Sequence, residues 1–128
     1  PDSKALYHAA AVMVSNQIVA LADMGTALLV KCGFSEAAAA EALSPLLLGN
    51  AQSVAEKGAV NALTGPIERG DAQTVSKHLQ EIRKFAAEST VGQDILTAYT
   101  ALSKQLIRIA QQKHPHKDYK HLEKELEQ

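Results

Sequence analysis

Apolar residues fill the first thirty positions of the chain almost without interruption. Residues 3 to 31 contain no proline and one glycine, Gly25, and residues 5 to 22 contain no Asp, Glu, Lys or Arg. On a helix the apolar positions run nearly all the way round, which is typical of a central helix that other helices cover on several sides. The pattern therefore predicts a long, buried first helix.

A turn and a second helix follow. Gly33 is placed to give the left-handed cap that ends the first helix, and Ser35 is placed to cap the start of the next one. We expect the second helix over residues 36 to 57, with Pro45 either kinking or splitting it, because proline lacks an amide donor. Gly58 ends this helix ahead of a short helical turn.

A polar loop bracketed by glycines, Thr64 to Gly70, separates the second helix from the third. Asp71 is expected to cap the third helix. The apolar positions of that helix recur at three-to-four spacing, which is typical of one buried face: Val75, Leu79, Ile82 and Ala86.

The fourth helix is expected to begin at a capping box of Thr90 and Gln93 and to end at His114-Pro115. Its apolar stripe comprises Ile95, Tyr99, Leu102, Leu106 and Ile109. We expect one helical domain over residues 1–113 and a charged C-terminal tail or short helix over residues 114–128. Since no segment shows the alternation typical of a strand, the predicted fold class is all-α, a compact helical bundle with a long central first helix.

Composition narrows the function classes. The 13 Lys and Arg residues balance 14 Asp and Glu residues, so no basic field attracts nucleic acid or an anionic membrane surface. Residues 5 to 22 resemble a membrane span, but His8, Ser15 and Asn16 interrupt them and no basic flank precedes them, which favours a helix of a soluble protein. The single cysteine, Cys32, cannot form an internal disulfide, and we therefore expect a cytoplasmic location.

Polar residues on the apolar first helix are the first candidates for chemistry. His8 and Ser15 share a narrow stripe, and Asn16 begins a second stripe beside it. A histidine can give or take a proton near neutral pH, and an asparagine can orient a carbonyl or hydroxyl group. His8 and Asn16 are therefore candidate catalytic residues, and Ser15 is a candidate substrate contact. The alternative is that these groups only satisfy one another or a neighbouring backbone inside the core.

The glycine-bracketed loop is the second candidate site. Arg69 carries a planar guanidinium that suits a carboxylate or phosphate, and Thr64 is placed to join it in substrate binding. Spacing alone favours the competing interpretation, a compact connector in which Arg69 pairs with Asp71 or Glu68. No metal site is expected, because the C-terminal histidines lack the paired Glu-x-x-His pattern of a metal site in a helical bundle.

Three segments in fixed order, YHAAAVMVSN, CGFSEAAA and LTGPIERGDAQTVSKHL, resemble the C-terminal helical domain of bacterial oxidoreductases that carry an N-terminal Rossmann domain. The function of that helical domain is unknown. The likeness covers about residues 4 to 110 and extends distantly to ketopantoate reductase, pyrroline carboxylate reductase and phosphogluconate dehydrogenase. It implies a helical fold like the C-terminal domain of phosphogluconate dehydrogenase. It also implies binding of a small-molecule substrate beside a nicotinamide, and a homodimer.

The resemblance also bears on single residues. Asn16 matches the helix asparagine that sits beside the substrate in several of those reductases. They often place a catalytic lysine one turn earlier, where this chain has Val12, which leaves His8 as the candidate acid.

No G-x-G-x-x-G motif follows a strand pattern in this sequence. We therefore expect no cofactor in this chain, NADP or NAD in a parent protein that supplies the Rossmann domain as a partner, and no enzymatic activity of the chain alone. The alternative, from a different class, is a stand-alone helical module for protein interaction.

Overall fold

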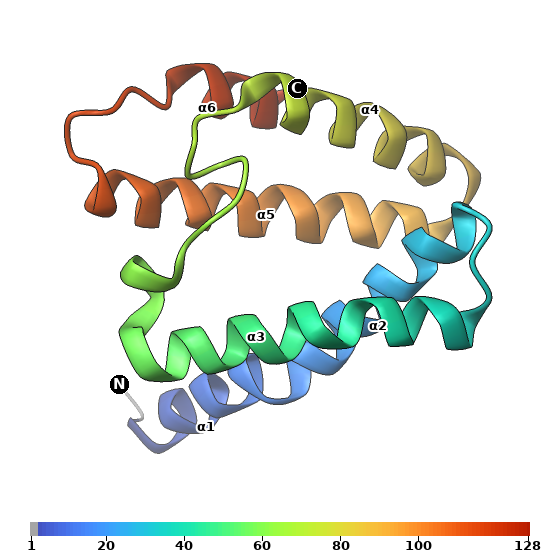
Figure 1. Cartoon of the computed structure of the whole chain (residues 1–128), viewed down its shortest axis with the longest axis horizontal. Coiled ribbons are helices and arrows are strands. Elements are labelled where there is room, and N and C mark those ends of the chain that lie inside the picture. The colour runs from blue at the N-terminus through green and yellow to red at the C-terminus, as the bar shows by residue number, and fades with distance from the viewer. Residues whose placement is uncertain (1–2) are drawn as a thin grey trace. The chain divides into compact units, whose positions relative to one another are not determined.

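The structure, a computed structural model, describes residues 3 to 128, and these residues form helices joined by turns, without a strand (Figure 1). The helices are α1 (Ser3–Val14), α2 (Asn16–Lys31), α3 (Glu36–Ala62), α4 (Ala72–Glu88), α5 (Thr90–Lys113) and α6 (Lys120–Glu127). The predicted all-α class is therefore confirmed. The chain divides into two compact units, Pro1–Ala51 and Gln52–Gln128. The expected domain boundary between residues 113 and 114 stays a prediction.

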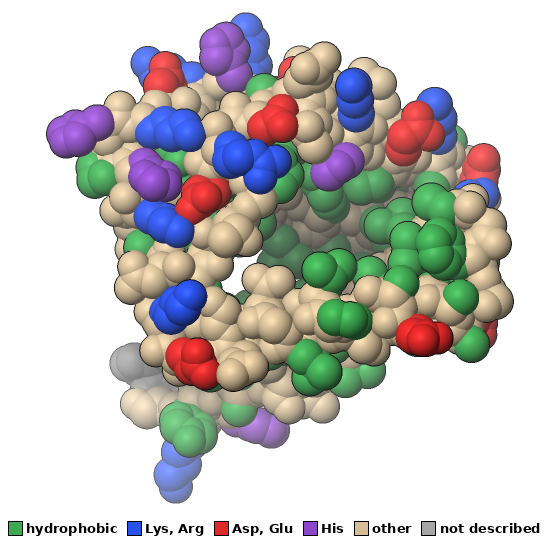
Figure 2. Space-filling model, viewed as in Figure 1, with side chains coloured by type: hydrophobic (Ala, Val, Ile, Leu, Met, Phe, Trp, Pro, Cys, Tyr) green, Lys and Arg blue, Asp and Glu red, His purple; other side chains and the backbone are tan. Residues whose placement is uncertain are grey.

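The first unit begins with the long apolar stretch. α1 and α2 follow each other with a single turn residue between them, Ser15, whose backbone N–H still donates to Ala11 O at 3.0 Å. The predicted long first helix is thus present, but neither α1 nor α2 contains a buried residue. Residues 5 to 22 are therefore not buried as predicted, and Figure 2 shows hydrophobic side chains (green) on the surface of the molecule.

By length and composition, Ser3–Lys31 also qualifies as a membrane span, and none of its most apolar window is buried. Core helices of soluble proteins and signal sequences near an N-terminus have the same length and composition.

Local rules account for the hairpin between α2 and α3. Gly33 adopts φ 99°, and the Ser35 hydroxyl accepts a hydrogen bond from Ala38 N at 3.1 Å, so both predicted caps are confirmed. Pro45 does not split α3, because the one residue of α3 with non-helical angles is Gly58 (φ 79°, ψ 167°). A Cβ at Gly25 would lie 3.2 Å from the Leu43 side chain, so glycine lets α2 and α3 approach closely.

The second unit holds a true hydrophobic core. α4 and α5 lie side by side in opposite directions, and α6 contacts both (Figure 1). The predicted stripe of α4 is buried throughout. Val75 and Leu79 of this stripe form one cluster with residues of the loop, of α5 and of the C-terminal segment: Leu63, Ile67, Ile107, Ala110, Tyr119, Leu122 and Leu126.

The turn between α4 and α5 corrects the expected capping box. Ser89 is the cap of α5, since its hydroxyl accepts a hydrogen bond from Gly92 N at 2.9 Å. The prediction that Thr90 and Gln93 form the box is therefore wrong. A Cβ at Gly92 would lie 2.3 Å from Phe85 O, so glycine is required where the two helices meet.

Residues 114–128 contain α6, and that helix is part of the core. Tyr119, Leu122 and Leu126 are each less than 5% exposed. Their spacing of three and four residues places them on one face of the helix. The C-terminal segment therefore contributes apolar surface to the second unit.

Candidate functional site

The candidates of the first unit, His8, Ser15 and Asn16, are all exposed. Ser15 makes no side-chain capping bond to α2. Because exposed polar groups are solvated, these residues do not need the internal partners that a buried helix would have required. Their proposed catalytic and substrate-binding roles stay predictions.

The loop from Gly65 to Asp71 in the second unit has a fixed backbone. Gly65 (φ 98°) and Gly70 (φ 72°) adopt positive φ values that favour glycine. Within the loop, Arg69 N donates to Gly65 O at 3.2 Å and Asp71 N donates to Pro66 O at 2.8 Å. Two backbone hydrogen bonds therefore close the loop on itself.

Glu68 ties this loop to the C-terminal segment. The Lys113 ammonium lies 2.6 Å from the Glu68 carboxylate and donates to Leu63 O at 2.8 Å, while His114 Nε2 lies 3.7 Å from the same carboxylate. The Tyr119 hydroxyl donates to Glu68 O at 2.8 Å. The hydrogen bond from Lys113 lowers the pKa of Glu68 against the opposing effect of burial. Burial, together with the Glu68 charge, raises the pKa of Tyr119.

Arg69, in contrast, makes no side-chain hydrogen bond or ion pair with Glu68, Lys113 or Tyr119 and is paired only loosely with Asp71. Its side chain is 61% exposed, and its guanidinium comes no closer than 4.0 Å to Asp71. The Asp71 carboxylate instead accepts hydrogen bonds from Thr74 N at 3.0 Å and from the Thr74 hydroxyl at 2.7 Å, which lower its pKa. Thr64 is exposed as well. The 4.0 Å contact between the Arg69 guanidinium and the Asp71 carboxylate agrees with the connector interpretation. The exposed guanidinium can still donate hydrogen bonds to an anion.

Sequence reasoning missed a second polar arrangement, between α4 and α5. His78 Nδ1 lies 2.9 Å from the Tyr99 hydroxyl, and the two rings meet edge to face at 6.0 Å. Burial raises the pKa of Tyr99, and the Ser103 hydroxyl, one turn further along α5, opposes that effect. The signals available in the sequence were the position of His78 inside the LTGPIERGDAQTVSKHL segment and the one-turn spacing of Tyr99 and Ser103.

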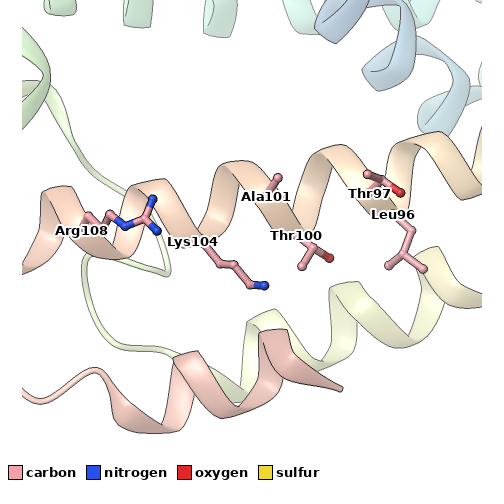
Figure 3. A pocket seen from close by; sticks show the side chains of 6 residues that line it. All are labelled: Leu96, Thr97, Thr100, Ala101, Lys104 and Arg108. Carbon is pink, nitrogen blue, oxygen red and sulfur yellow. The ribbon is translucent and has the colours of Figure 1, made fainter.

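A shallow hollow of about 560 Å³ runs along α5 (Figure 3). Its lining combines hydroxyls, two cations and apolar side chains: Leu96, Thr97, Thr100, Ala101, Lys104 and Arg108. Such a lining suits a polar, negatively charged molecule. Among residues 3–128 no group of three or more His, Cys, Asp or Glu side chains is arranged to hold a metal ion.

Comparison with known proteins relates the chain to one protein family. No curated protein and no solved structure matches the chain. A family model described as Domain of unknown function (DUF2520) matches residues 1–106, which include α1, α2, the glycine-bracketed loop and the His78–Tyr99 pair. Because that match spans most of the sequence, the chain belongs to the DUF2520 family.

Proposed function

We propose that this chain is the substrate-binding and dimerisation domain of an NAD(P)-dependent oxidoreductase whose Rossmann domain lies outside the sequence described. The resemblance of three separate segments to such helical domains supports this function. The all-helical fold agrees with it, and the family match covers all three segments. A small-molecule substrate, a nicotinamide cofactor held by the other domain and a cytoplasmic location are parts of the same proposal.

The exposed apolar surface of the first unit is the observation that carries the dimerisation role. Large hydrophobic side chains on α1 and α2 are between 41% and 80% exposed: Leu6, Tyr7, Met13, Val14, Val19, Leu21 and Val30. Large exposed apolar surfaces on soluble proteins mark interaction sites, and most homo-oligomers are two-fold dimers. A second copy of the chain is therefore the occupant we propose.

Within the parent enzyme, Asn16 and His8 would border the substrate, with Ser15 as a further contact. In the second unit, Thr64 and the exposed Arg69 would bind substrate. The open donors of Arg69 suit a carboxylate or phosphate group of the substrate.

Light scattering at micromolar concentration tests the dimer. We expect the mass of two chains for the wild type and the mass of one for Val19→Lys, because Val19 is 69% exposed on α2 and a lysine there would be buried without a partner. Val91→Lys, at a 51% exposed position of α5, is the matched control and should remain dimeric. A wild-type mass of one chain would refute the dimerisation role.

The alternative function is a stand-alone helical module that binds another protein through the same apolar surface. The gene upstream of Pro1 discriminates the two. A strand followed by a glycine-rich turn there would support the oxidoreductase domain, and its absence would support the interaction module.

A further inference from the structure

The turn between α5 and α6 contains a second hollow of the second unit, with a volume of about 460 Å³. It is lined by Lys113, His114, Pro115, His116 and Lys117, which we call the basic turn. The two lysines are cations, and each histidine donates a ring N–H and becomes a cation on protonation. Figure 2 shows Lys and Arg (blue) and His (purple) side chains gathered over this turn.

Lys117 connects the basic turn to the glycine-bracketed loop. Its ammonium lies 3.4 Å from the backbone oxygen of Glu68, and a Cβ at Gly70 would lie 3.4 Å from its Cε. The Lys117 side chain therefore contacts the loop on both sides of Arg69. Both Arg69 and His116 are exposed. Because the guanidinium of Arg69 and the ammonium of Lys117 extend from neighbouring parts of the backbone, one bound anion can contact both.

The carboxylates nearest to these cations already have partners. Glu68 is paired with Lys113 at 2.6 Å, and Asp71 caps α4. The Asp118 carboxylate accepts a hydrogen bond, 2.9 Å long, from the second backbone N–H after it. Lys117 forms no ion pair with a carboxylate of the described chain, and its ammonium approaches a backbone oxygen and an aromatic ring instead. Its charge is therefore available to an anion from outside the chain.

We propose that the basic turn and the glycine-bracketed loop together bind the phosphate group of a small molecule, with Lys117, Arg69 and His116 as its contacts. A phosphate monoester carries nearly two negative charges and three acceptor oxygens, which suits three donors from two segments. A carboxylate has one charge and two oxygens, and the same donors therefore hold it less tightly. In the parent oxidoreductase the phosphate belongs to the substrate, and only this part of the inference rests on the proposed function.

The first test is a titration of this chain with inorganic phosphate at constant ionic strength, followed by ¹H–¹⁵N NMR. We expect saturable shifts of the backbone amides of Arg69 and of residues 116–118, and at least tenfold weaker binding of acetate. Lys117→Met and Arg69→Met should each raise the dissociation constant for phosphate about tenfold, the loss expected for one charge-assisted hydrogen bond. Lys124→Met, which removes an exposed lysine of α6, is the matched control and should leave it unchanged.

Three results would overturn the phosphate site: no saturable shift at these amides, equal affinity for acetate and phosphate, or equal effects of Lys124→Met and Lys117→Met. The second test separates the substrate from the cofactor as the source of the phosphate. In the full-length protein, Lys117→Met should leave the affinities for NADPH and NADH unchanged, and a tenfold loss of NADPH affinity would overturn the substrate assignment. A full-length protein that binds neither cofactor would refute the proposed function, whereas the phosphate titration of this chain would still decide the site.

Discussion

The Lys113 ammonium lies 2.6 Å from the Glu68 carboxylate and joins the last turn of α5 to the glycine-bracketed loop. The same ammonium donates to Leu63 O, and Tyr119 donates to the backbone carbonyl of Glu68. The side chain and backbone of Glu68 thus connect the glycine-bracketed loop to the C-terminal segment.

This ion pair predicts a pH dependence of stability. The pKa of Glu68 in the folded chain lies below its ordinary value of 4.5. The Glu68 carboxylate therefore adds its full stabilisation above that value, and this stabilisation is lost as the pH falls through the lower folded-state pKa. Glu68→Gln should remove this acid-side loss from denaturant melts measured between neutral pH and pH 3. Glu127→Gln, at an exposed position of α6, is the control, and equal acid profiles for wild type and Glu68→Gln would contradict the prediction.

Gly92 should not tolerate a side chain. A Cβ there would meet Phe85 O at 2.3 Å, so Gly92→Ala must push α4 and α5 apart. We expect a loss of about 1–3 kcal/mol in the free energy of unfolding, the usual cost of overpacking. Gly49→Ala is the matched helical control, because a Cβ at Gly49 meets nothing within 4 Å. It should stabilise the chain by roughly 0.5–1 kcal/mol through helix propensity. Equal effects of the two substitutions in urea melts would rule out the close approach.

The cap of α5 can be tested residue by residue. Ser89→Ala should destabilise the chain by about 1 kcal/mol, because Gly92 N loses its hydrogen-bond acceptor. Thr90→Ala should change stability little, since Thr90 is exposed and lies inside the helix. Chemical denaturation of both variants decides which hydroxyl caps the helix.

Structural features that are determined by residues close together in the sequence were predictable. The caps at Gly33, Ser35 and Asp71 follow from rules that act within one turn of helix. Pro45 was harder, because a single missing amide donor bends or breaks a helix depending on the packing around it. Ser89 was missed because the capping-box pattern pointed to Thr90, which has Gln93 three residues later, whereas Ser89 has Gly92 there. The extended backbone angles of Ser89 place the cap one residue earlier.

The polar contacts of the second unit could not be predicted in this way. His78 and Tyr99 are 21 residues apart, and Lys113 is 50 residues from the carbonyl of Leu63 that it contacts. Such pairs depend on the packing of α4, α5 and α6, which helical periodicity alone does not determine. Periodicity did contain one unused signal, since the spacing of Tyr119, Leu122 and Leu126 indicated a buried face in the charged C-terminal segment.

Calorimetric titration of NADPH and NADH into the full-length gene product and into this chain tests the proposed oxidoreductase domain most directly. We expect the full-length protein to bind one of the two cofactors and this chain to bind neither, because the pyrophosphate-binding turn belongs to the Rossmann domain. Low-micromolar binding by this chain, or no binding of either cofactor by the full-length protein, would contradict the account.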